Sequence, residues 1–291
     1  MKPASFHYHA PHTVADTVNL LAQHGDEVKP LAGGQSLVPL LALRMSRFEH
    51  LVDLNGVGEL SGITRQNGVV RVGAMTRQRA AERDVTVGDA VPLLARALPL
   101  IGHFQIRNRG TIGGSLAHAD PASELPAVAA TLDATFEIAS ASGTRQVAAA
   151  DFFAGHFTTA IVEGELLVAI QFPVWEAGSG FAIREFARRH GDFAVAGATA
   201  AVHVSNGVID RAALAFFGMG TTPLRARTAE AALVGQTART VDPRTIAESA
   251  VSDTEPGDDI HASATHRRHI ATQLAADAIR SAITEAVGVP A

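Results

Sequence analysis

The sequence predicts an α+β protein in which helices and short apolar strands alternate first and an antiparallel sheet follows. Segments with helix and strand periodicity alternate from about residue 13 to residue 172. Strand-like segments after residue 180 include two that are joined by Asn206-Gly207, a two-residue hairpin signal. Of the 291 residues, 47% are hydrophobic and 18% are charged, so the chain can bury a substantial core.

The N-terminal segment predicts the order helix, strand, glycine loop, helix, strand. "PHTVADTVNLLAQHG" is typical of a helix capped at Thr13 and stopped at Gly25. "EVKPLA" predicts a short strand that leads into the glycine pair 33–34. Ser36 can cap a turn or short helix through "LVPLLALR", and "HLVDL", residues 50–54, predicts a buried strand.

A second set of elements begins with a strand at "GVVRVGA". "VPLLARALPLIG" predicts a helix with Pro92 near its first turn. In "DPASELPAVAATL", Asp120 as N-cap, Pro121 at the first helical position and Glu124 in the first turn indicate a helix start. The strands "TFEIAS" and "LLVAIQF" then close this part of the chain.

A domain boundary is expected at "VWEAGSG", residues 174–180. Beyond it, "FAIREFAR", "VAGATAAVHVS" and "VIDRAALAFFG" predict three antiparallel strands. Alanine-rich segments, "TAEAALVG" and "PRTIAESAV", and a long segment from about Ser263 to Val287 predict helices that complete this part.

Charge and composition exclude several classes of protein. The net charge of -5 and the pI near 6.2 argue against binding to nucleic acid or to an anionic membrane surface. No signal segment and no membrane-spanning apolar run is evident, so membrane insertion is not expected and a cytoplasmic protein is. Because the chain has no cysteine, it has no thiolate-ligated metal or iron–sulfur cluster of its own, and any redox chemistry needs an organic cofactor.

Two glycine-rich loops interrupt apolar runs, one in "LAGGQSLVPLLALR" and one in "RNRGTIGGSLAHADPASELPA". Glycine lets the backbone approach a ligand closely, so that successive N–H groups can bind an anion such as a pyrophosphate. The alternative is a pair of tight strand-to-helix turns. Neither loop has the G-x-G-x-x-G pattern or a Walker lysine, which excludes ordinary Rossmann and P-loop sites.

The order of motifs along the chain resembles the FAD-binding medium subunit of molybdenum hydroxylases, the group that contains carbon monoxide dehydrogenase and the flavin part of xanthine dehydrogenase. The likeness rests on both loops, on F-x-Y-x-x-P from Phe6, and on "FFAGHFTTAIVEGELLVAIQFP", "REFARRHGDFAVAG" and "DIHASATHRRH". It implies a two-part FAD-binding domain (PCMH-type) at residues 1–175 and a smaller domain of three antiparallel strands packed with helices at 176–291.

The resemblance also implies which residues hold a non-covalent FAD. The two loops would bind its pyrophosphate, with these residues: Ala32, Gly33, Gly34, Gln35, Ser36 and Leu37 in the first loop, and Thr111, Ile112, Gly113, Gly114 and Ser115 in the second.

Four further residues are implied by resemblance at the sugar and ring ends of FAD. Glu124 would reach the ribose or ribityl region, although as a first-turn residue it can equally serve the helix dipole. Arg184 stands where the family usually has lysine near the flavin head; the planar guanidinium differs from lysine in geometry. Asp192 and Phe193 would approach the isoalloxazine, or alternatively form a salt-bridged strand end.

Other charged residues and histidines receive weaker interpretations. Arg107 and Arg109 flank the second loop, either as surface charges or as positive groups that tune the flavin potential. The histidines at 261, 266 and 269 and those at 7, 9 and 12 could suggest metal binding. His7 and His9 share one side of a strand, but a solvated edge is the more common reason, and no metal ligand is assigned.

On the family interpretation, the chain carries electrons and has no catalytic acid, base or nucleophile. A large subunit would bind molybdopterin, a small subunit would hold the [2Fe-2S] clusters, and FAD on this chain would pass electrons to a terminal acceptor, in a dimer of heterotrimers. The alternatives are a self-contained FAD-dependent oxidase or reductase and a non-enzymatic flavin-binding protein. The substrate, the acceptor and the stoichiometry do not follow from the sequence.

Overall fold

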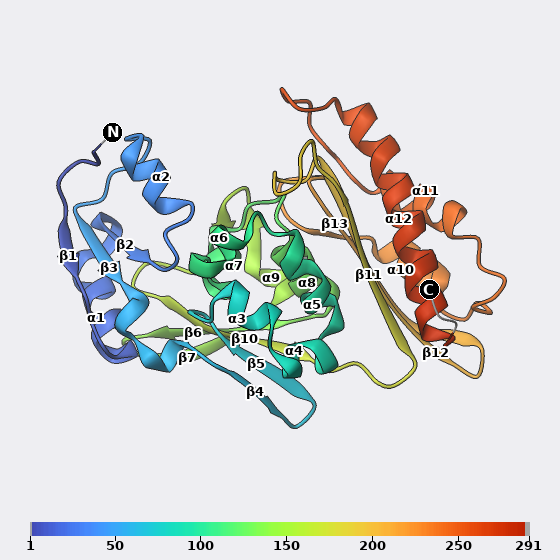
Figure 1. Ribbon diagram of the computed structural model, residues 1–291, viewed down its shortest axis with the longest axis horizontal. Coiled ribbons are helices and arrows are strands. Elements are labelled where there is room, and N and C mark those ends of the chain that lie inside the picture. The colour runs from blue at the N-terminus through green and yellow to red at the C-terminus, as the bar shows by residue number, and fades with distance from the viewer. Residues whose placement is uncertain (1, 289–291) are drawn as a thin grey trace.

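The computed structural model describes residues 2–288 and arranges them around three main sheets (Figure 1). The first is a parallel sheet in the order β1-β3-β2, formed by β1 (His7–His9), β3 (His50–Asp53) and β2 (Val28–Leu31). α1 (Val14–His24) begins at Thr13, whose side chain accepts a hydrogen bond from the Asp16 N–H, as predicted. The helix is followed by the 3₁₀ turn η1 (Gly25–Glu27), and the short α2 (Leu37–Ala42) follows the first glycine loop.

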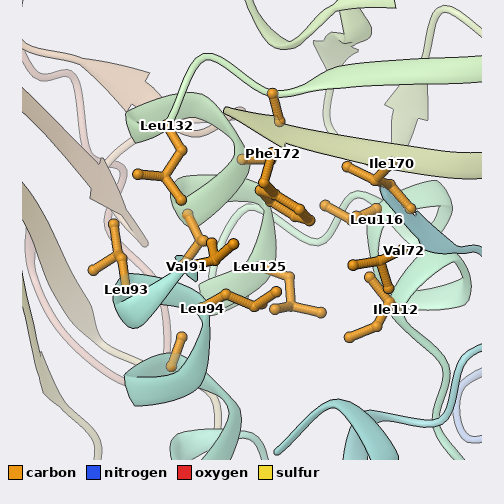
Figure 2. Packing of buried hydrophobic residues seen from close by; sticks show 14 of the residues in the cluster. Val72, Val91, Leu93, Leu94, Ile112, Leu116, Leu125, Leu132, Ile170 and Phe172 are labelled. Carbon is orange, nitrogen blue, oxygen red and sulfur yellow. The ribbon is translucent and has the colours of Figure 1, made fainter. Parts of the chain in front are cut away.

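The second sheet is antiparallel and holds the largest core. Its order is β4 (Ile63–Gln66), β5 (Val69–Gly73), β10 (Leu166–Pro173), β6 (Thr135–Ser140) and β7 (Gly143–Ala148). Helices cover it, and their apolar side chains meet those of the strands in Figure 2. The remaining elements of this part are η2 (Leu54–Gly56), η3 (Gly58–Leu60), α3 (Gln78–Glu82), α4 (Val85–Ala90), α5 (Pro92–Ala97), η4 (Leu98–Leu100), α6 (Phe104–Arg109), α7 (Ile112–His118), α8 (Glu124–Thr131), α9 (Ala149–Phe152), β8 (Phe153–Gly155) and β9 (Thr158–Thr159).

The third sheet contains the three antiparallel strands expected from the sequence and one more. Asn206 and Gly207 both have positive φ, 53° and 80°, as the predicted tight hairpin requires. A two-residue strand, which the sequence did not indicate, pairs at one edge. The elements are β11 (Ser179–Phe186), β12 (Ala196–Ser205), β13 (Val208–Phe217), β14 (Leu224–Arg225), α10 (Arg227–Leu233), α11 (Pro243–Ser252) and α12 (Ala264–Ala286).

The third sheet is covered on both faces. One face packs against α10 to α12, and the other contributes Phe181, Ile183 and Phe217 to the core of the second sheet. Polar contacts join the same two parts: Thr131 and Thr199 share a hydrogen bond of 2.6 Å, and the Arg225 guanidinium donates to the Ala130 carbonyl at 2.6 Å. The core is therefore continuous between the part of the chain that forms the first two sheets and the C-terminal part.

One helix start differs from the prediction. α8 begins at Glu124 with Ser123 as N-cap, rather than at Asp120. The Asp120 carboxylate instead accepts from the Ala122 N–H at 2.9 Å in a local turn, and the Pro121 carbonyl accepts from the Gly218 N–H at 2.7 Å. A contact with the third sheet thus holds residues 120–122 out of the helix.

No helix within residues 2–288 combines the length and apolar character that a bilayer crossing would require.

Gly180 lets α12 lie directly against β11. A Cβ at this position would overlap the Ala282 carbonyl and lie 2.7 Å from the Ala286 N. We expect Gly180→Ala to lower the free energy of unfolding by more than about 2 kcal/mol, because the helix must shift from the sheet. The measurement is chemical denaturation followed by circular dichroism.

Gly88→Ala is the control for this prediction. Position 88 lies in α4 with open space around it, so the added methyl group should stabilise the chain by about 0.5–1 kcal/mol. Equal stability of Gly180→Ala and the unmodified chain would contradict the expectation.

Candidate functional site

The first glycine loop presents a run of free backbone donors at the end of β2. Among the described residues, no hydrogen-bond acceptor is found for the N–H groups from Gly33 to Leu37. The loop lines a cavity of about 370 Å³, together with residues at the end of β3. Gly34 has φ of 72°, which a glycine adopts without strain. A run of unpaired N–H groups beside a cavity is suited to binding an anion.

Side chains of the first loop lie differently from its backbone. The Gln35 amide folds back onto the loop and donates to the Gly33 carbonyl at 3.2 Å. Ser36 occupies the N-cap position of α2, as expected, but its hydroxyl makes no capping hydrogen bond. The first loop therefore offers the ligand mainly its main chain.

The two glycine loops are in direct contact. A Cβ on Gly33 would overlap the Arg109 carbonyl and lie 2.9 Å from the Gly110 Cα. A Cβ on Gly114 would lie 3.2 Å from the Cβ of Ala32. The structure thus brings together the two segments that the sequence placed about eighty residues apart, and glycine permits their close approach.

The second loop differs from the first because its N–H groups are already used within the protein. Thr111 is the N-cap of α7, and Gly113 lies so close to β5 that a Cβ would be 2.7 Å from the Ala74 Cα. The N–H groups from Ile112 to Ser115 each donate to a protein oxygen; in order, the acceptors are Thr76 O (3.0 Å), Ala74 O (2.8 Å), Thr111 Oγ1 (3.0 Å) and Thr111 O (3.2 Å). The N–H groups of the second loop are therefore not free to bind a ligand. This loop contacts the first loop and supports it.

Opposite charges line the cavity beside the first loop. Asp53, Asn55 and Arg109 complete its wall. Partial burial alone would raise the pKa of Asp53, but hydrogen bonds from Tyr8 and Asn55 and the charge of Arg109 hold it below its usual value. Sequence reasoning missed Asp53 and Asn55. Their only signal in the sequence is that Asp53 lies near the end of the strand predicted at residues 50–54 and that Asn55 directly follows it; in the structure Asp53 is the last residue of β3, which pairs with β2.

Glu124 is a buried carboxyl group, only 5% exposed, at the first position of α8. Burial raises its pKa to about 8; its own N–H opposes the shift, and the charges of Glu185 and Asp120 add to it. The protonated form therefore predominates at neutral pH.

Arg184 and Glu185 lie on opposite faces of β11. The Arg184 guanidinium donates to the Ser281 hydroxyl at 2.8 Å and to the Ile183 carbonyl at 2.9 Å, on the side of α12. Glu185, whose charge acts on Glu124, has its pKa raised to about 7 by burial, and its Oε2 has no partner within residues 2–288. The structure does not bring Arg184 to the loops, and it is Glu185 that faces the FAD-domain part.

The turn that contains Asp192 and Phe193 lies between β11 and β12. The Asp192 N–H donates to the Arg189 carbonyl at 3.1 Å, and the Phe193 ring is 60% exposed. Gly191 packs against His103, so that a Cβ would be 2.8 Å from the imidazole Cε1. The turn thus approaches the segment before α6, which leads into the second loop.

Arg107 and Arg109 differ in their surroundings, although the sequence analysis treated them together. Arg107 is buried, pairs with Glu82 at 2.9 Å and donates to the carbonyls of Ile101 and Gly102 at 2.9 and 3.2 Å. Its charge is compensated, and it holds a turn in place. Arg109 alone reaches the cavity wall.

Comparison with known families identifies both parts of the chain. The family described as "FAD binding domain in molybdopterin dehydrogenase" matches residues 4–175. The chain belongs to this family. The "CO dehydrogenase flavoprotein C-terminal domain" matches residues 181–282.

Curated relatives and solved structures agree with this assignment. Subunit alpha of the 6-hydroxypseudooxynicotine dehydrogenase complex of Paenarthrobacter nicotinovorans is 42% identical, over 93% of this chain and 92% of the relative. The carbon monoxide dehydrogenase medium chain of Hydrogenophaga pseudoflava is 36% identical, over 97% and 98%. The solved structure of carbon monoxide dehydrogenase from that organism, lacking the Mo-pyranopterin moiety, superposes with a TM-score of 0.94 at 38% identity, covering 97% of this chain and 98% of that one.

A further solved relative is named for quinoline and not for carbon monoxide. The structure of quinoline 2-oxidoreductase from Pseudomonas putida 86 has a TM-score of 0.92 and 38% identity, over 98% and 99% of the two chains. This chain is thus an FAD-binding medium subunit of the molybdenum hydroxylase type, an oxidoreductase component.

Proposed function

We propose that this chain carries non-covalent FAD and transfers electrons from the [2Fe-2S] clusters of a partner subunit to a terminal acceptor. The observation that carries the proposal is the run of unpaired N–H groups from Gly33 to Leu37 beside a cavity of about 370 Å³. Such a site fits the pyrophosphate of a dinucleotide. A bound flavin supplies the ability to accept electrons singly and to release them singly or as a hydride.

In this proposal the protein binds and orients the cofactor. The first loop donates hydrogen bonds to the pyrophosphate, and the second loop holds the first at the required distance by the packing of Gly33 on Gly110. Arg109 offsets the negative charge of Asp53 in the same wall. Glu124 contacts the ribose or ribityl hydroxyls, and the turn with Asp192 and Phe193 lies toward the flavin ring.

The proposed partners are a large molybdopterin-binding subunit and a small [2Fe-2S] subunit, assembled as a dimer of heterotrimers. The proposal is supported by the relatives, which are named as a medium chain or a subunit of a dehydrogenase complex. It is also supported by the absence of cysteine from the whole sequence, because the iron–sulfur clusters then require another chain. The boundary between the two domains is proposed near residue 175, where β10 has ended and β11 has not begun.

The experiment has two stages. The purified chain, reconstituted with FAD where necessary, should show a flavin spectrum at one FAD per chain, and denaturation should release the flavin unmodified. In the complex purified with its partner subunits, rapid-mixing absorbance with carbon monoxide, an aldehyde or an N-heteroaromatic compound should show cluster reduction before flavin reduction. FAD bound by the chain but reduced by substrate without the partner subunits would contradict the electron-transfer role; absence of FAD from the complex would overturn the cofactor assignment.

A further inference from the structure

Histidines from three elements gather at the edge of the first sheet. His7 and His9 lie on β1, His24 is the last residue of α1, and His50 is the first residue of β3. In Figure 1 these elements lie together at the N-terminal side of the molecule. The His24 and His50 rings stack with centroids 3.7 Å apart, and the His7 and His9 rings lie 5.1 and 5.2 Å from the His50 ring.

Three of these imidazoles have the spacing of metal ligands. One nitrogen each from His9, His24 and His50 lies within 4.8 Å of the other two, and the His9 Nε2 is 2.9 Å from the His50 Nδ1. Zinc–nitrogen bonds of about 2.0–2.1 Å place two ligand nitrogens roughly 3.4 Å apart in a tetrahedral site. In this structure the His9 Nε2–His50 Nδ1 contact is a hydrogen bond and the His24 ring stacks on the His50 ring. Coordination therefore requires this hydrogen bond to break and the His24 ring to turn out of the stack, and the partial burial of the rings leaves room for that rotation.

We propose that His9, His24 and His50 form a binding site for a divalent cation of the Zn²⁺ class, with a water molecule as the fourth ligand. Imidazole is a preferred ligand of Zn²⁺, Ni²⁺ and Cu²⁺, and the ligands come from different elements, as in a site that joins parts of a fold.

The turn after α1 adds negative charge beside the cluster. Glu27, in this turn, lies close enough to His50 for the charge of its carboxylate to act on the imidazole, so it would also attract a bound cation.

The site lies away from the flavin cavity. His50 is at the start of β3 and pairs with Val28 at the start of β2, whereas Leu31 and Asp53, at the other ends of these strands, line the cavity. With about 3.3 Å per strand residue, the separation is roughly 10 Å. A cation here would fasten β1, α1 and β3 together and stabilise the small sheet from which the first loop emerges.

Zinc titration of the full-length chain tests the site. The chain, without an affinity tag and after treatment with a chelator, is titrated with Zn²⁺ by isothermal calorimetry, and its thermal unfolding is followed with and without Zn²⁺. We expect one Zn²⁺ per chain and a rise in Tm. His50→Ala and His24→Ala should each weaken binding at least about tenfold and abolish the rise in Tm, because each removes one of three protein ligands.

Two histidine variants serve as matched controls. His266→Ala, on α12, removes an imidazole elsewhere, and His7→Ala removes a neighbouring ring that is not among the ligands. Both should keep the affinity within about threefold. Absence of stoichiometric Zn²⁺ binding, or equal affinity in His24→Ala and the unmodified chain, would overturn the proposal. If His50→Ala loses FAD or its circular dichroism spectrum, His24→Asn, which keeps a polar side chain at the helix end, decides instead.

Discussion

Gly33→Ala is expected to weaken FAD binding by at least about 100-fold, equivalent to about 2.7 kcal/mol. The added Cβ would overlap the Arg109 carbonyl and lie 2.9 Å from the Gly110 Cα. The first loop must then move away from the second, which displaces the unpaired N–H groups from Gly33 to Leu37 beside the cavity. The measurement is the quenching of FAD fluorescence on titration with the FAD-free chain, together with the flavin content of the purified variant.

Gly58→Ala is the matched control for this prediction. Gly58 lies in η3, where a Cβ would meet no atom within 4 Å, so FAD binding should be unchanged. Thermal unfolding of the FAD-free variants separates loss of the site from loss of the fold. A Gly33→Ala chain that binds FAD as tightly as the unmodified chain would show that the contact between the loops does not shape the site.

Glu124→Gln is expected to change how stability depends on pH. The Glu124 carboxyl keeps its proton up to about pH 8 in the folded chain but loses it near pH 4.5 when unfolded. Between these values the folded state binds more protons, so the free energy of unfolding falls as pH rises. Glutamine removes this contribution. At pH 8.5 the variant should be more stable than the unmodified chain by on the order of 4 kcal/mol, with little difference at pH 4.5.

Urea denaturation of the FAD-free chains at pH values from 4.5 to 8.5 measures this effect. Glu255→Gln, at an exposed carboxylate in the C-terminal part, should retain the profile of the unmodified chain. The prediction would be wrong if Glu124→Gln were less stable than the unmodified chain at pH 8.5 as well as at pH 4.5. The ionised Glu124 carboxylate would then be stabilised, and not penalised, in the folded chain. A separate FAD titration of the same variant tests the proposed contact with the ribose or ribityl hydroxyls.

Local signals in the sequence were sufficient where neighbouring residues decide the structure. The Thr13 cap of α1 forms as predicted, because capping joins a side chain to an N–H three residues later. The helix predicted from about Ser263 forms as α12, and the Ser263 side chain caps it in the same way. The Asn206-Gly207 hairpin forms for a similar reason. The start of α8 was wrong because the Pro121 carbonyl bonds to Gly218, almost a hundred residues away.

In the candidate site, too, some features follow from local sequence and others depend on contacts between distant residues. Ordered motifs identified both glycine loops and the family from the sequence alone, and comparison confirms the family. The sequences of the two loops could not show which N–H groups remain unpaired. Ile112 and Gly113 donate to residues near β5, more than thirty positions earlier in the chain. Their sequences look alike, yet only the first loop presents a run of unpaired donors.

The sequence by itself therefore determined most of the longer elements, and it identified the family and the two glycine loops of the candidate site. Tertiary structure alone decided that Arg107 is buried against Glu82 while Arg109 faces the cavity, and that Glu185 rather than Arg184 faces Glu124. It also joined His24 and His50 to His9, which local patterns had left at a solvated edge. Charge compensation, burial and ligand spacing depend on contacts between distant parts of the chain, and these exist only when the sheets and helices have packed together.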